Sequence, residues 1–229
     1  MHVLVEAAVE SVAGAVAAGG AGAGRLELCA GLAEGGVTPS AGLVRAVRRR
    51  VELPLQVLLR PRPGDFRYDD GDVDAMLTDL HDLKLAGADG VVIGALSTEG
   101  GVDRDLVARL VARARPLAVS FHRAIDQVPD LGAAVATLAE LGIGRVLTSG
   151  GAPTALAGAD TLRRLVQRFG ATVTILAGGG VRADHVARLV QLTGVREIHL
   201  GPRLPDGAGL DVAELEGVIR ALTTPETRT

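Results

Sequence analysis

The chain alternates between two hydrophobic patterns along most of its length. Short runs rich in Val, Leu and Ile are typical of β-strands, and they lie at residues 2–6, 25–29, 55–59, 90–94, 117–121, 145–149, 172–176 and 197–201. Longer segments repeat apolar residues at i, i+3, i+4 and i+7, which is the helical period, and they include residues 73–88, 104–115, 131–142, 159–170 and 183–194. Gly142, Gly170 and Gly194 stand where helices are expected to end.

Eight strands alternating with helices in 229 residues predict an α/β protein, a (β/α)8 TIM-type barrel. We expect a single barrel domain over residues 1–222 and a polar C-terminal tail, residues 223–229, that frays. The same alternation also allows an open doubly wound sheet, although eight units would make that sheet unusually wide.

Composition narrows the range of partners. Aromatic residues are only 2% of the chain and the net charge is −3, so neither stacking faces nor a basic surface is available for nucleic acid. We see no uncharged apolar stretch of about 18 residues and no signal-peptide pattern, so we expect no membrane span. The single cysteine excludes an internal disulfide. Together these features predict a cytoplasmic protein.

Alternation within the strands predicts which side chains fill the barrel lumen. Leu26 and Leu28 suit the face that packs on helices, so Arg25, Glu27 and Cys29 are expected to point inward. The same reasoning turns a further set of side chains inward on four other strands: His2, Leu4, Glu6, Gln56, Leu58, Arg60, Ala118, Ser120, His122, Glu197 and His199.

Charged lumen positions gather near the barrel mouth. Glu6, Arg60 and His122 fall at or just after the carboxyl ends of their strands, where barrel active sites lie. His122 has the chemistry of a general acid or base near neutral pH, or of a metal ligand. The alternative is a structural ion-pair network in which Glu6, Glu27 and Arg60 fill a narrow barrel.

The loops after the strands add candidate ligand-binding groups. Residues 60–72 carry Arg62 and Asp65, and residues 122–126 carry Arg123 and Asp126. The segments LTSGG (147–151), AGGGV (177–181) and GPR (201–203) are predicted to lie at the same end, and glycine-rich backbone before a helix is a cradle for phosphate or another small anion. The candidate residues in the first two segments are Ser149, Gly178, Gly179 and Gly180.

Cys29 has two readings. A buried cysteine is usually inert packing, but a thiol at a strand end on the lumen face is a soft ligand that favours Cu(I). Because the chain holds no second cysteine, such a site would need His122 or a second subunit to complete it.

Several of these motifs together resemble the CutC family of copper homeostasis proteins. They are ELCAGLAEGGVTPS (27–40), RPRPGDFRYDDGD (60–72), FHRAID (121–126), LTSGG (147–151) and AGGGV (177–181), and the resemblance runs in order from the first strand to about residue 200. It implies a (β/α)8-type barrel, a cytoplasmic location, homodimers or larger homo-oligomers, and Cu(I) binding and trafficking. The motif positions carried over are Glu27, Cys29, Glu34, Arg60, Arg62, Asp65, His122, Arg123 and Asp126.

The chain departs from the family pattern in two places. Residues 6–11 lack the cysteines that some members hold there, and the segment at 200–209 is short.

Three functions therefore remain open. The first is copper homeostasis through Cu(I) bound by Cys29, with His122. The second is an enzyme acting on a small anionic or phosphorylated metabolite. In this enzyme His122 is the acid or base, and Glu6, Glu27 and Asp126 assist. Arg60 and Arg62 hold the anion, and the glycines at 178–180 add N–H donors. Asp65, Arg123 and Ser149 are further candidate ligand-binding residues. The third is a structural oligomer whose polar mouth has no catalytic role.

Overall fold

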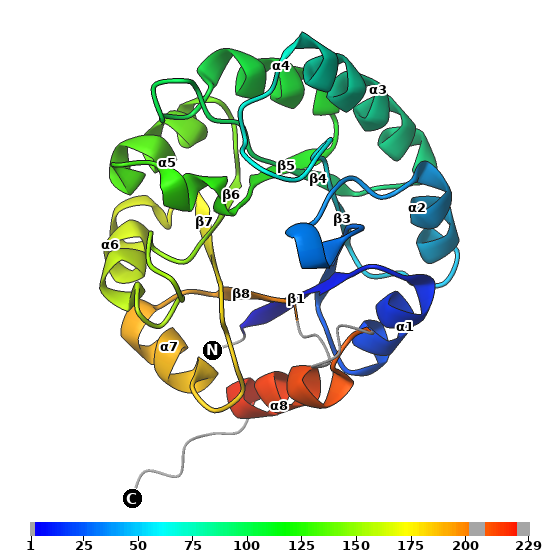
Figure 1. The fold of residues 1–229 in the computed structure, drawn as a ribbon. Coiled ribbons are helices and arrows are strands. Elements are labelled where there is room, and N and C mark those ends of the chain that lie inside the picture. Colours follow the sequence, from blue (N-terminus) through cyan, green and yellow to red (C-terminus); the bar gives the residue numbers. More distant parts are fainter. Residues whose placement is uncertain (1–2, 202–208, 224–229) are drawn as a thin grey trace, which may run out of the picture.

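A closed barrel of parallel strands organises the computed structural model, which describes residues 3–201 and 209–223. Its strands are β1 (Leu4–Val9), β2 (Arg25–Leu28), β3 (Leu55–Leu58), β4 (Gly90–Ile93), β5 (Ala118–Phe121), β6 (Arg145–Thr148), β7 (Thr174–Gly178) and β8 (Glu197–Leu200). Each strand pairs with the next, and β8 pairs with β1 to close the sheet (Figure 1). The (β/α)8 barrel expected from the sequence is confirmed, and the open sheet is excluded.

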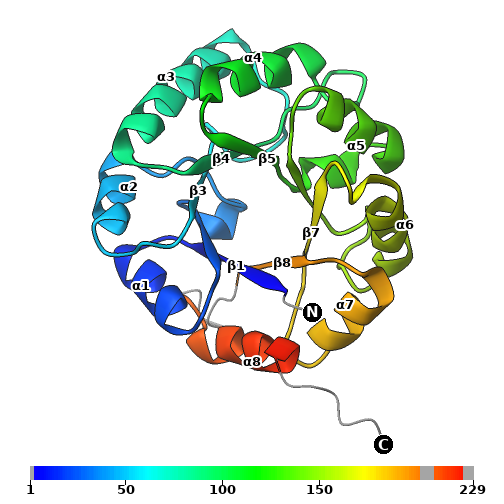
Figure 2. The ribbon, with the colours of Figure 1, turned by 180° about the vertical axis from the view of Figure 1, so that it is seen from behind.

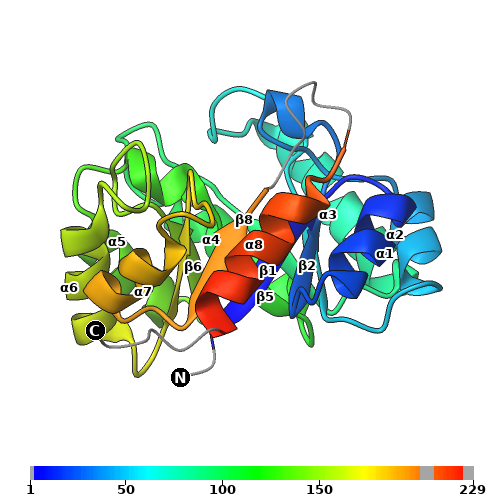
Figure 3. The same cartoon turned by 90° about the horizontal axis from the view of Figure 1, so that it is seen from below.

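Helices form a ring around the barrel, as Figures 1 and 2 show from opposite ends. They are α1 (Val12–Gly20), α2 (Ala41–Arg48), α3 (Asp70–Ala86), α4 (Arg104–Ala114), α5 (Leu131–Glu140), α6 (Ala159–Phe169), α7 (Val186–Thr193) and α8 (Val212–Thr223). Two 3-10 helices, η1 (Leu32–Glu34) and η2 (Arg123–Gln127), lie in the loops after β2 and β5. Figure 3 shows η1 above the barrel, at the end where the strands finish.

Polar caps set where many helices begin. Ser11, Ser40, Asp69, Asp103 and Asp130 each accept a hydrogen bond from the backbone N–H three residues later, and each such cap stabilises its helix by about 1 kcal/mol. The cap at Asp69 explains why α3 starts at residue 70 rather than at the expected residue 73.

The first strand and the C-terminal tail differ from their expected boundaries. The first strand was expected at 2–6 but covers 4–9, because its register with β2 continues until Val9 lies opposite Leu28. Of the expected tail, Thr223 belongs to α8, and residues 224–229 lie outside the described residues. No helix in the described part of the chain has both the length and the apolar character needed to cross a bilayer.

As the sequence predicted, alternation along the strands sends apolar side chains to two different faces of the sheet. Leu26 and Leu28 are fully buried in the main core between barrel and helices, and burial of each stabilises the fold by about 2 kcal/mol. Cys29, Leu58 and Val92 form a separate buried cluster on the other face of the sheet, against Leu32 of η1. This second cluster forms part of the mouth of the barrel.

Candidate functional site

An ion-pair network fills the middle of the lumen. Arg25 binds Glu6 through Nε and reaches Glu197 Oε2 through Nη2 at 2.5 Å. Arg145 also binds Glu197, with Nε 2.7 Å from Oε2, and its Nη1 donates to Ser120 Oγ at 3.2 Å. Burial alone would raise the pKa of Glu197, but hydrogen bonds from the two arginines outweigh it and lower that pKa. These residues satisfy one another, so this part of the lumen is structural.

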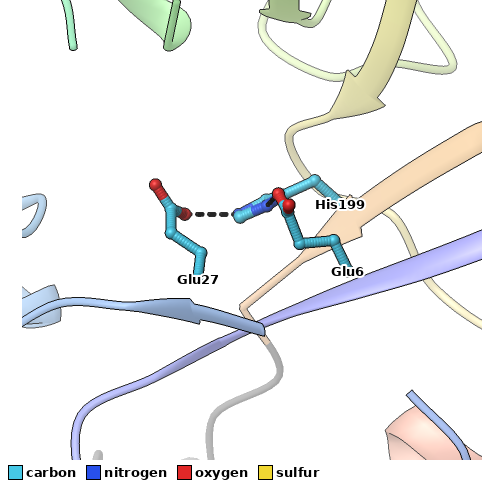
Figure 4. A group of neighbouring side chains, drawn as sticks. All are labelled: Glu6, Glu27 and His199. Carbon is cyan, nitrogen blue, oxygen red and sulfur yellow. Dashed lines mark hydrogen bonds and ion pairs between the residues drawn. The ribbon is translucent and has the colours of Figure 1, made fainter. Parts of the chain in front are cut away.

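Above this network, His199 lies between two carboxylates (Figure 4). Its Nδ1 is 2.8 Å from Glu6 Oε1, and its Nε2 is 3.5 Å from Glu27 Oε2. Burial alone would lower the pKa of His199, but the hydrogen bond to Glu6 and the charge of Glu27 outweigh it and raise that pKa. Ligand atoms of the three side chains lie within 4.8 Å of one another, which is compatible with a bound cation, although both oxygens of Glu6 are already engaged.

Glu6 and Glu27 have opposite protonation behaviour. For Glu6, burial is outweighed by the hydrogen bond from His199 and the charges of His199 and Arg25, and the pKa falls to about 2. For Glu27, burial raises the pKa to about 7, with only partial opposition from the charge of His199. Glu27 therefore exchanges a proton near neutral pH, whereas Glu6 stays ionised.

A cavity of about 160 Å³ opens above His199 at the barrel mouth. It is lined by Glu27, Cys29, Leu32, Gly35, Leu58, Arg60, Phe66, His122, Arg123, Leu147 and His199. The structure thus brings together five of the residues singled out from the sequence, namely Glu27, Cys29, Arg60, His122 and Arg123.

His122 is held in one tautomer. Its Nδ1 accepts a hydrogen bond from the backbone N–H of Ala124 at 3.1 Å, so in the neutral ring Nε2 carries the hydrogen. Burial lowers the pKa of His122 to about 3, and the charge of Arg60 adds to the effect. A ring that stays neutral near pH 7 does not suit the acid–base role expected from the sequence. A Cβ on Gly94 would lie 2.0 Å from the ring, so only glycine fits beneath it.

Arg60 is a buried cation, 5% exposed. Its Nη1 donates to Gly36 O at 2.9 Å and its Nη2 to Gly64 O at 2.7 Å, and the guanidinium lies 4.8 Å from the centre of the Phe66 ring. All of these partners are uncharged, so the described residues provide Arg60 with no ion pair.

Cys29 is fully buried on the cavity wall. Its Sγ lies 3.6 Å from the carbonyl oxygen of Val9, and Leu58 and Val92 pack around it. Among the described residues that line the cavity, its thiol is the one sulfur.

Other expected site residues lie elsewhere. Arg62 and Asp65 pair with each other at 3.1 Å, and Arg62 also binds Asp72 at 2.8 Å. They stiffen the loop after β3 and are absent from the cavity wall.

The side chain of Asp126, which belongs to η2, binds the glycine-rich loop after β6. Its carboxylate accepts the backbone N–H groups of Ser149 and Gly151, each at 3.1 Å, and the hydroxyls of Thr148 and Ser149. The chain's own carboxylate thus fills the cradle in which phosphate was expected.

The other glycine-rich segments serve close packing. Gly178 lies against Leu147 and His199, and a Cβ on Gly179 would come within 3.0 Å of the Arg123 guanidinium. Gly180, with φ of +66°, adopts the left-handed backbone that favours glycine. Pro202 and Arg203 of the expected third segment lie outside the described residues.

The main residue missing from the sequence-based site is His199. Alternation along β8 predicts that His199 points into the lumen, but it does not predict which residues lie beside it. His199 lies opposite Glu6 because β8 pairs with β1 and closes the barrel. With closure included, the pairing of Glu6 with His199 follows from strand register.

Fold and site together define a (β/α)8 barrel with a small cavity at its mouth, lined by both charged and apolar side chains. A sequence model of the CutC family matches residues 3–203, and the chain belongs to that family. The copper homeostasis protein cutC homologs of Mus musculus and Homo sapiens are 44% and 43% identical over 207 residues, which are 90% of this chain and 76% of each relative.

Solved structures agree with this assignment. A CutC structure from Streptococcus agalactiae superposes with a TM-score of 0.82 at 28% identity, covering 86% of this chain and 97% of that one. Thiamine phosphate pyrophosphorylase from Pyrococcus furiosus has a TM-score of 0.66 at 14% identity over 96% of this chain and 95% of that one, which shows a shared fold alone.

Proposed function

We propose that this chain acts in cytoplasmic copper homeostasis by holding Cu(I) as exchangeable cargo in the mouth cavity. The names of its mouse and human relatives support the process. The observation that carries the molecular role is that the Cys29 thiol and the His199 imidazole line one small cavity. Thiolate and imidazole are both ligands that copper accepts.

His199 suits the second ligand position better than His122. A metal-binding histidine usually directs its other ring nitrogen to a carboxylate or carbonyl acceptor, which fixes the free lone pair on the metal. His199 has this arrangement, since Glu6 takes Nδ1 and leaves Nε2 beside Glu27. In His122, Nδ1 is instead an acceptor, so Nε2 keeps its hydrogen.

The ligand set fits a transient ion. One thiolate and one imidazole give low coordination, without the second or third soft ligand of a closed copper site. A cargo ion must leave as well as enter, and an incompletely enclosed ion is easier to pass on. Binding displaces protons from the thiol and the imidazole, so affinity is expected to rise with pH.

Anaerobic Cu(I) titration against a competing chelator tests this role. We expect wild type to bind one equivalent, and Cys29→Ser and His199→Gln each to bind at least roughly 100-fold more weakly, since even second-sphere losses cost 10- to 100-fold. His81→Gln, at an exposed position of α3, is the matched control and should bind as wild type does. Equal affinities for wild type and Cys29→Ser would refute the proposal.

A further inference from the structure

Arg60 is a buried positive charge without a negative partner in the described structure. Its guanidinium contacts two backbone carbonyls and the Phe66 ring and lies near the buried Tyr68 hydroxyl, and none of these groups carries charge. Glu27 shares the cavity, but its ion pair is with His199. Buried charges are costly unless paired, so the absent partner of Arg60 points to an anion supplied from outside.

A second unpaired donor belongs to His122, which lines the same cavity. The Nε2 of His122 and the Nε of Arg60 are both buried and have no hydrogen-bond partner among the described residues. Since Nδ1 of His122 accepts from Ala124, both unpaired atoms are N–H donors. Leaving a buried donor unpaired costs about 1–3 kcal/mol, which an acceptor oxygen would recover.

The rest of the cavity fixes the class of anion. Leu58, Phe66 and Leu147 add apolar surface to the cavity wall, with Phe66 lying against both Arg60 and His122, and the cavity volume is about 160 Å³. A ligand of this size combines a short carbon skeleton with one anionic group.

The donors of this cavity suit a carboxylate group better than a phosphate group. Phosphate sites on this kind of barrel use the N–H groups of glycine-rich loops. Here the N–H groups of Ser149 and Gly151 are taken by Asp126. A carboxylate needs fewer donors than a phosphate, and the two unpaired N–H groups of Arg60 and His122 are the donors that this cavity wall offers.

We propose that the mouth cavity binds a small organic carboxylate, with its oxygens on Arg60 and His122 and its carbon skeleton against Leu58, Phe66 and Leu147. Arg123, at 43% side-chain exposure, adds positive charge on the cavity wall. The site uses different side chains from the proposed copper ligands, and it does not rest on the copper proposal.

Binding of acetate, lactate, pyruvate and succinate, measured by ligand-observed NMR and calorimetry at low salt, tests the site. We expect at least one to bind wild type with a Kd between micromolar and millimolar, and inorganic phosphate to bind at least tenfold more weakly. Arg60→Gln and His122→Phe should each weaken the carboxylate at least tenfold. Arg164→Gln, on the exposed face of α6, is the matched control and should leave its affinity unchanged.

A measurement on the wild-type protein tests the site without relying on variants that could fail to fold. In 15N-labelled wild type, the bound carboxylate should shift the Nε–H resonance of Arg60 and the Nε2–H resonance of His122. Binding that leaves both resonances in place, binding unaffected by Arg60→Gln, tighter binding of phosphate, or no binding by any of the four carboxylates would each overturn the proposal. Loss of Cu(I) binding in Cys29→Ser with the carboxylate still bound would separate the two sites.

Discussion

Two glutamates of the lumen show how neighbours decide a side chain's chemistry. Glu6 accepts from His199 and Arg25 through separate oxygens and has a pKa of about 2. Glu27 has one charged partner, at 3.5 Å, and burial raises its pKa to about 7. Alternation along the strands predicted that both face inward. It did not predict their opposite protonation, which depends on distances of a few ångströms across the barrel.

The raised pKa of Glu27 predicts a pH-dependent effect of Glu27→Gln. Between about pH 4.5 and pH 7 the folded state keeps a proton that the unfolded state releases, so the contribution of Glu27 to stability is lost as pH rises through that window. Glutamine does not titrate. Urea denaturation should show the stability of the variant relative to wild type improving from pH 5 to pH 8, by on the order of 2 kcal/mol.

Glu52→Gln is the control, because Glu52 is exposed in the loop between α2 and β3. It should follow wild type at every pH. Parallel stability curves for Glu27→Gln and wild type would show that Glu27 is ionised in the folded protein at pH 5.

Among the elements, the loop between β6 and α6 depends most on a residue from another segment. Asp126 of η2 accepts from Thr148, Ser149 and Gly151, which lie 22 to 25 residues later in the chain. The sequence indicated a glycine-rich anion cradle there. It did not indicate that the anion is Asp126, because hydrophobic patterns carry no information on contacts between two loops.

Replacing Asp126 with alanine should therefore destabilise the fold. The change leaves the Ser149 and Gly151 N–H groups and the Thr148 hydroxyl without their acceptor, and Thr148 and Ser149 are fully buried. We expect a loss of about 2–4 kcal/mol in the free energy of unfolding, measured by urea denaturation. Asp160→Ala, which breaks an exposed pair with Arg163, should cost less than about 1 kcal/mol. Similar costs for the two variants would contradict this role for Asp126.

At the scale of the whole molecule, closure of the barrel creates the site. Eight strand positions and the direction of their side chains could be read from alternation, since that pattern is local. The contacts of Glu6 with His199 and of Arg25 with Glu197 join residues 193 and 172 positions apart. These contacts exist only because β8 pairs with β1. The positions of the strands along the sequence do not by themselves show that the first and last strands pair.

The exposed apolar residues of the outer surface do not test the expected homo-oligomer, which stays a prediction. The large apolar side chains exposed in the described structure are Val16 on α1, Leu85 on α3 and Leu192 on α7. They lie on different helices of the ring, and isolated apolar residues are normal on a monomer surface. Light scattering at two protein concentrations will measure the association state directly.

Arg25 tests the lumen network as a unit. It carries the positive charge shared by Glu6 and Glu197 and is 4% exposed. Methionine in its place preserves much of the volume but removes one of the two cationic partners of each carboxylate, leaving His199 with Glu6 and Arg145 with Glu197. Breaking a buried ion pair typically costs about 3–5 kcal/mol. Arg104→Met, which removes an exposed pair with Glu140, should cost less than about 1 kcal/mol.

The cost of Arg25→Met should also shrink in acid. Glu6 has a folded-state pKa of about 2, so its contribution is full above about pH 4.5 and declines as pH falls toward 2. At pH 3 the wild type has lost part of that stabilisation, and the variant has less left to lose. Urea denaturation of both proteins at pH 7 and pH 3 measures the difference. A cost that stays constant between the two pH values would mean that Arg25 stabilises the barrel by packing rather than by its charge.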